Sequence, residues 1–255
     1  QQETGRPLAV DEDTLNTLIA ALPFSLTLAQ QRVLRDITGD LQHTYPMRRL
    51  LQGDVGSGKT VVALLAMLIA VGNGMQAVMM APTEVLAEQH FHTLSSMLES
   101  MTQRLRATGA ATAGWVGQTQ VGLLRGSLTA AEKERIRAQI ASGEVKIVVG
   151  THALIQEDAT FRDLGLAIVD EQHRFGVGQR AALRQKGYHP HVLVMSATPI
   201  PRTLALTLYG DLDLSIIDEL PPGRQKIQTK WLAPYDRERA YGFLRQQVES
   251  GRQAF

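Results

Sequence analysis

The sequence contains no cysteine, and its acidic and basic residues almost balance. Without Cys, neither a disulfide framework nor a thiolate metal site can form, so zinc fingers are excluded. The formal net charge of +1 argues neither for nor against nucleic acid, because such a partner can be held by a local basic patch. With 44% hydrophobic residues, the 255-residue chain can form a packed core in one large domain or two small ones.

Long hydrophobic runs are also absent. The longest apolar stretch, residues 61–71, is far shorter than the roughly 20 residues needed to span a bilayer, so we expect no membrane role. The N-terminus starts with Gln rather than Met and lacks the basic start and apolar run of a signal peptide. We therefore expect an excised piece of a cytoplasmic protein.

Short apolar runs alternate with longer segments of helical periodicity. The short runs predict strands at 49–51, 77–80, 121–124, 146–149, 166–169 and 192–195. The longer segments predict helices at 11–21, 27–40, 59–71, 84–101, 130–141 and 174–186, and Thr27 is the expected cap of the second. This alternation is typical of an α/β fold with a doubly wound parallel sheet.

Two parts of the chain depart from this pattern. Residues 107–122 are rich in Ala, Thr, Gly and Gln and are interpreted as a strand and a loop. A Pro-Pro-Gly-Arg run at 221–224 indicates a linker. Beyond it, only a strand at 227–232 and a helix at 236–250 are expected, and these cannot enclose a core. We therefore expect the start of a second domain that is cut off early.

The segment GDVGSGKT has the spacing of a phosphate loop. We expect all its residues to bind ATP: Gly53, Asp54, Val55, Gly56, Ser57, Gly58, Lys59 and Thr60. The glycines let backbone amides point at the phosphates, and the following helix presents its positive end to them. Lys59 supplies a point charge for the terminal phosphates, and the Thr60 hydroxyl is placed to ligate Mg²⁺. The structural alternative is a glycine turn before an ordinary helix, which the strand before the loop makes the poorer interpretation.

Two carboxylates follow the apolar strand predicted at 166–169. Ligands bind at the carboxyl edge of such sheets, which is where Asp170 and Glu171 are expected. Asp170 fits the carboxylate that acts on Mg²⁺ through the shell of Thr60, and Glu171 fits the base that deprotonates the attacking water. A solvated acidic turn is the alternative interpretation.

Polar residues beyond these carboxylates suggest a relay of nucleotide state. We expect Gln172 and His173 to pass the state of the γ-phosphate to Ser196 and Thr198, which follow another strand. His173 taken alone is better explained as an ordinary surface histidine. Ser196 and Thr198 have the alternative role of capping a helix at 199–208.

Several motifs together resemble superfamily 2 helicases, with matching order and spacing: GDVGSGKT, APTEVLAEQH from Ala81, GTHALI from Gly150, DEQH from Asp170 and SATPIPRT from Ser196. More narrowly, LPFSLTLAQ, DEQHRFGVGQR and DELPPGRQ resemble the RecG family of ATP-dependent DNA helicases. The transcription-repair coupling factors are a related alternative that usually has Glu at the position of Gln172. A non-helicase nucleotide switch or kinase is the alternative from another class, against which the APTE and SATP motifs argue.

The resemblance implies a RecA-like motor domain that uses ATP and Mg²⁺. Phe24 and Gln30 resemble the contacts on the adenine side. The residues that resemble DNA-facing motifs are Pro82, Thr83, Gly150, Thr151 and His152. Contact with the phosphate backbone that reads no bases is what translocation needs. Helix capping is the structural alternative for Thr83 and Thr151.

The resemblance also implies a partner and a domain organisation. Members act on branched or duplex DNA, such as stalled forks and Holliday junctions, in recombination and repair. They carry an N-terminal wedge domain and a second motor domain with arginine fingers. A monomer is expected, with three parts in this chain: a helical preface at 1–26, the ATP-binding domain at 27–220, and a linker with the start of the second motor domain at 221–255. Residues 107–122 are longer than the family pattern, so no function is assigned to them.

Overall fold

The computed structural model of the chain describes residues 5–152, 159–170, 189–198, 212–221 and 229–254. The chain divides into two compact units, residues 1–221 and 222–255. The first unit contains the sheet and both apolar cores, so it is described first.

Seven strands form a single parallel sheet in the first unit. They are β1 (Arg48–Gly53), β2 (Gln76–Ala81), β3 (Gln120–Leu124), β4 (Val145–Thr151), β5 (Leu164–Asp170), β6 (His191–Ser196) and β7 (Asp213–Ile217). Their order is β3-β4-β2-β5-β6-β1-β7, and every neighbouring pair is parallel. Six of the strands confirm the sequence predictions. The seventh, β7, was not predicted because its residues alternate between exposed and buried and form no continuous apolar run.

Helices connect these strands and precede the first of them. They are α1 (Glu12–Ala20), α2 (Leu28–Leu41), α3 (Lys59–Gly72), α4 (Glu84–Ala107), α5 (Thr112–Gln118) and α6 (Ala130–Ser142). Thr27 caps α2 as predicted: its hydroxyl accepts a hydrogen bond from the Gln30 backbone N–H, 3.2 Å away. The helices predicted at 174–186 and 199–208 lie outside the described residues.

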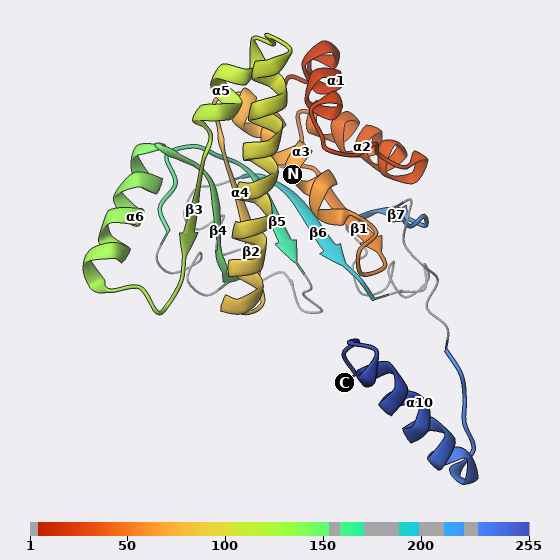
Figure 1. The fold of residues 1–255 in the computed structure, drawn as a ribbon. Coiled ribbons are helices and arrows are strands. Elements are labelled where there is room, and N and C mark those ends of the chain that lie inside the picture. The colour runs from red at the N-terminus through yellow and green to blue at the C-terminus, as the bar shows by residue number, and fades with distance from the viewer. Residues whose placement is uncertain (1–4, 153–158, 171–188, 199–211, 222–228, 255) are drawn as a thin grey trace. The chain divides into compact units, whose positions relative to one another are not determined.

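Both faces of the sheet are buried, as a doubly wound fold requires. Adjacent strand residues belong to different cores: Met79 lies in the core on the side of α1 to α5, and Met80 lies in the core that includes Ile140 of α6. Figure 1 shows α3 and α4 running along the sheet, with α6 beside β3 and β4. The predicted α/β fold is confirmed.

The interpretation of residues 107–122 was partly wrong. α4 extends to Ala107, and a seven-residue helix, α5, precedes β3. Helix α5 contains Gly and Thr, which are poor helix formers, so local propensity did not reveal it. Burial of Val116 and packing of Trp115 against the core hold it in place.

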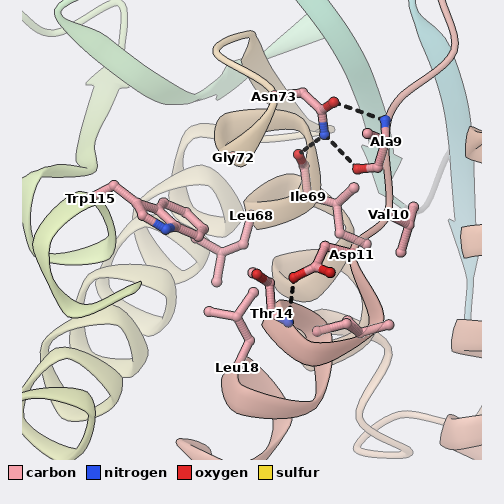
Figure 2. A pocket seen from close by; sticks show the side chains of 11 residues that line it. Ala9, Val10, Asp11, Thr14, Leu18, Leu68, Ile69, Gly72, Asn73 and Trp115 are labelled. Carbon is pink, nitrogen blue, oxygen red and sulfur yellow. Dashed lines mark hydrogen bonds between the residues drawn. The ribbon is translucent and has the colours of Figure 1, made fainter. Parts of the chain in front are cut away.

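The chain before α1 is fastened to the far end of α3. The Asn73 side chain accepts a hydrogen bond from the Ala9 N–H and donates one to the Ala9 carbonyl, both at 2.8 Å. Figure 2 shows this bridge and the hydrogen bond by which Asp11, the N-cap of α1, accepts from the Thr14 N–H. The Trp115 ring lies across a pocket whose volume is about 220 Å³. The preface is therefore part of the folded unit.

The second unit contains a short 3₁₀ helix, η1 (Pro234–Asp236), and helix α10 (Arg237–Glu249). Helix α10 confirms the prediction at 236–250 and is followed by Gly251, whose φ is 81°. The strand predicted at 227–232 is wrong for residues 229–232, which have no regular structure, and its other residues lie outside the described ones. A strand needs a neighbour to pair with, and the described residues of this unit offer none.

Candidate functional site

The register of the sheet brings the candidate segments to one edge. β5 pairs Asp170 with Met195, and β1 pairs Gln52 with Ser196. On the other side, β2 pairs Ala81 with Thr151. The chain therefore leaves β1, β2, β4, β5 and β6 at the carboxyl edge, where parallel sheets bind ligands.

The predicted phosphate loop joins β1 to α3 through two left-handed glycines. Gly56 has a φ of 77° and Gly58, the N-cap of α3, has a φ of 87°. At Gly53, a Cβ atom would lie 2.6 Å from Ser57 Oγ and 3.2 Å from the Ile217 carbonyl oxygen, so a side chain there would force its neighbours to shift. The Ser57 N–H donates to the Asp54 carbonyl at 3.0 Å. This loop therefore has the compact turn and helix start that phosphate binding needs.

Lys59 and Thr60 lie in the first turn of α3. The Lys59 ammonium donates to the carbonyls of Gly53, at 2.6 Å, and Asp54, at 3.2 Å. The charge therefore lies against the loop itself. Val55 at the tip of the loop is 72% exposed.

Gln30 braces the phosphate loop, a role that the sequence did not indicate. Its Nε2 donates to the Ser57 carbonyl at 2.8 Å, and its Oε1 accepts from the Thr27 N–H at 2.9 Å. Gln30 is 2% exposed, whereas Phe24, the other residue assigned to the adenine side, is 46% exposed. The acceptor and one amide hydrogen of Gln30 are thus already used, and adenine contact remains a prediction for both residues.

Asp170 ends β5 and is buried, but its partner was missed from the sequence. The His90 Nε2 atom of α4 lies 2.6 Å from Asp170 Oδ2. His90 ends the APTEVLAEQH motif, of which the resemblance assigns a role only to Pro82 and Thr83 at its start. No spacing rule joins positions 80 residues apart, so only the tertiary structure could reveal this pair.

His152 follows β4 and is also close enough to Asp170 to feel its charge. Burial lowers the pKa of His152, and the charge of Asp170 opposes that shift. Both ring nitrogens are buried without a hydrogen-bond partner. The structure thus places a buried imidazole of the segment predicted to face DNA near a carboxylate predicted to act on Mg²⁺.

The other residues predicted to face DNA lie where β2 and β4 end. Pro82 and Thr83 are exposed, Thr151 is half-buried and Gly150 is buried. Thr83 caps α4 by accepting from the Leu86 N–H at 3.3 Å, so the capping alternative is confirmed for this residue. For Thr151, the segment that a cap would serve lies outside the described residues.

The remaining predicted residues are only partly placed. Ser196 Oγ accepts from the Thr198 N–H at 3.1 Å, so these two residues form a small turn at the end of β6. Glu171, Gln172 and His173 lie outside the described residues. Their predicted roles as base and relay therefore stay predictions.

The donor set at this edge suits Mg²⁺ better than a soft metal. Thr60 and Asp170 offer oxygen ligands, and Mg²⁺ usually binds through one or two carboxylates with water and substrate phosphates. Among the described residues, no group of three His, Cys, Asp or Glu side chains is arranged to hold a metal. Thr60 and Asp170 therefore remain the predicted ligands of Mg²⁺.

The family model of DEAD/DEAH box helicases matches residues 27–207. The chain belongs to this family. Its whole length is 49% identical to the ATP-dependent DNA helicase RecG of Synechocystis and 46% identical to RecG of Bacillus subtilis. It covers 29% and 35% of those proteins, so this helicase chain spans about a third of the curated relatives that it matches.

Solved structures agree with this helicase fold. The structure of RecG bound to a three-way DNA junction matches 97% of the chain and 31% of its own length, with a TM-score of 0.79 and 43% identity. The DNA-bound helicase MrfA, at 18% identity and a TM-score of 0.62, supports the fold alone. The predicted RecA-like fold and the resemblance to RecG are confirmed. No helix in the described part of the chain is long and apolar enough to cross a bilayer.

Proposed function

We propose that this chain is the first motor domain of an ATP-dependent DNA helicase that acts on branched DNA in recombination and repair. The observation that carries the proposal is the similarity of the whole chain to RecG, one of whose structures holds a three-way DNA junction. The common edge of the sheet supports it, because the phosphate loop, Asp170 and the segments predicted to face DNA all begin there.

ATP is bound by residues 53–60. Backbone amides and the start of α3 hold the phosphates, and Lys59 leaves the loop carbonyls to place its charge on the terminal ones. Thr60 and Asp170 would hold Mg²⁺, which would neutralise negative charge on the nucleotide phosphates. Glu171 is the base that takes a proton from the attacking water. Phe24 and Gln30 serve the adenine side.

DNA is held by backbone contacts that carry no sequence information. Pro82 and Thr83 follow β2, and residues 150–152 include the end of β4. Because these two strands are neighbours in the sheet, the two segments start side by side. Gln172, His173, Ser196 and Thr198 relay nucleotide state between the two sites. Branched substrates are recognised by the rest of a monomeric chain, with a wedge domain before this part and a second motor domain after it.

Turnover needs both motor domains. Arginine fingers supplied by a second domain contribute about 10³ to 10⁵ in rate, so residues 1–255 alone are expected to bind nucleotide weakly and hydrolyse it near background. Equal turnover by this piece and by the full-length protein would contradict the proposal.

ATP turnover of the full-length protein, measured with a three-way junction, with linear duplex and without DNA, tests the function. We expect the junction to stimulate most, and Lys59→Ala to abolish nucleotide binding measured by calorimetry. Turnover that no DNA changes would point instead to a nucleotide switch or kinase. Intact nucleotide affinity in Lys59→Ala would exclude the phosphate loop as the binding site.

A further inference from the structure

His90 and Asp170 form a contact that the proposed chemistry does not use. The His90 Nε2 and Asp170 Oδ2 atoms are 2.6 Å apart, and their side chains are only 14% and 10% exposed. Because an aspartate carboxylate accepts hydrogen bonds, the imidazole Nε2 carries the proton and donates it. A short hydrogen bond to a charged group is among the stronger ones in proteins, so this bond fixes the orientation of the carboxylate.

His90 lies on helix α4, which begins directly after the segment 82–83 that is predicted to face DNA. The helix starts at the Thr83 cap, directly after Pro82, and His90 lies about two turns further on. In the sheet β2 lies between β4 and β5, and Met80 of β2 pairs with Val169 of β5. The chain that leaves β2 and turns into α4 therefore starts beside Asp170.

The same two turns of α4 are tied to a second loop at this edge. Glu84 Oε1 accepts from the Gly126 N–H at 2.8 Å, and Glu88 forms an ion pair with Arg125, both in the loop after β3. Glu84 and Glu88 are four residues apart and share one face of the helix, whereas His90 lies on another. A movement of the start of α4 would thus displace both the loop after β3 and the Asp170 carboxylate.

We propose that His90 is a positioning residue, which fixes the Asp170 carboxylate and joins it to the helix that begins at the DNA-facing segment 82–83. The inference rests on the proposed function, in which Asp170 acts on Mg²⁺. Hydrogen-bond partners of a ligating carboxylate orient it for the metal, and their loss typically costs 10- to 100-fold in metal affinity or activity. DNA bound at the start of α4 thereby acts on the carboxylate through one rigid helix.

Three variants of the full-length protein separate positioning from packing. His90→Leu removes the donor, and His90→Gln keeps an N–H group at a similar reach. His92→Leu is the matched control, because His92 lies two residues away on the same helix and is exposed. The measurement is the Mg²⁺ concentration that gives half-maximal binding of a fluorescent, non-hydrolysable ATP analogue.

We expect His90→Leu to raise this Mg²⁺ concentration about tenfold, and to reduce the ratio of junction-stimulated to DNA-free turnover by a similar factor. His90→Gln and His92→Leu should stay within about twofold of the natural protein. A natural Mg²⁺ requirement in His90→Leu, or equal impairment in His90→Gln, would overturn the inference. His90→Met takes the place of His90→Leu if that variant does not fold.

Lys59→Ala distinguishes this inference from the function on which it rests. If Lys59→Ala loses nucleotide binding and His90→Leu behaves as the natural protein, only the role of His90 is wrong. If Lys59→Ala still binds nucleotide, the proposed function is wrong, whatever result His90→Leu gives.

Discussion

At the scale of single residues, Gly58 shows why the phosphate loop accepts no other residue there. Its φ of 87° lies in the left-handed region, and a Cβ atom would lie 2.2 Å from Gln30 Nε2. The Gln30 side chain is buried and holds Ser57, so it cannot simply swing aside. A side chain at position 58 would therefore both strain the backbone and break the hydrogen bond from Gln30 to the Ser57 carbonyl.

Gly58→Ala is expected to destabilise the fold by about 2 kcal/mol, of which about half comes from the left-handed backbone and half from the lost bond. Nucleotide binding should weaken with it. Gly74→Ala is the control, because Gly74 has a φ of 81° but nothing within 4 Å of an added Cβ. Urea unfolding of both variants checks this, and equal losses would contradict the role of Gln30.

His191 makes stability depend on pH. Its ring is 1% exposed, accepts from the Met47 N–H at 2.9 Å and donates to the Arg6 carbonyl at 2.9 Å. Burial lowers the pKa of His191, and the bond to Arg6 and the charge of Asp40 oppose the shift only in part. Because the folded state prefers neutral His191, its contribution is complete above the unfolded pKa of about 6.5 and is lost as pH falls below it.

We therefore expect the free energy of unfolding to fall between pH 7.5 and 5.5, and to fall less in His191→Gln. Burial lowers the pKa of His152 too, so part of the dependence should remain. His43→Gln, at an exposed histidine, is the control. Denaturant titrations at both pH values give the slopes, and an unchanged slope in His191→Gln would rule out this account.

At the scale of elements, the first turn of α2 contacts two separate segments, the phosphate loop and the residues after β7. Gln30 in its first turn holds the phosphate loop, and Glu219 Oε2 accepts from the Ala29 N–H of the same turn at 3.1 Å. Arg32 pairs with Asp218 and lowers the pKa of that carboxyl, but the pair is exposed and contributes little stability. The start of α2 therefore joins the predicted phosphate loop to the segment that precedes residue 222.

Two capping boxes allow this brace to be tested. Thr27 with Gln30 caps α2, and Thr129 with Glu132 caps α6 in the same way. Thr27→Ala should cost about 1 kcal/mol of stability and also weaken nucleotide binding, since it loosens Gln30. Thr129→Ala should give a comparable loss of stability with unchanged binding. Calorimetry on both variants decides, and equal nucleotide affinities would show that the cap does not support the loop.

At the scale of the whole molecule, the two apolar cores consist, within the part of the chain that the structure describes, of residues between Leu8 and Ile217. The edge strand β7 contributes Ile217 to the larger core, and Ser215 of β7 donates to Asp36 of α2 at 2.7 Å. Helix α10 of the second unit contains no buried residue. Strand β7 therefore contributes to the stability of the first unit.

A chain that ends at Pro221 should unfold at a midpoint within a few degrees of the 255-residue chain. A chain that ends at residue 211 loses β7 and the cap from Glu219, so it should melt at least about 5 °C lower or fail to fold. Thermal melts followed by circular dichroism compare them. Similar midpoints for both truncations would show that β7 is dispensable.

The sequence by itself determined the glycine-rich loop at 53–60, six strands of the sheet, the caps of α2 and α4 and the family, because each depends on residues close together in the chain. The spacing of glycines indicates a turn, the periodicity of apolar residues indicates a helix or a strand, and a threonine before a helix indicates where the helix starts. The tertiary structure alone decided what Gln30 holds, which partner Asp170 has, and that α5 and β7 form. These depend on burial and on contacts between distant segments, such as His90 with Asp170, which no local pattern encodes.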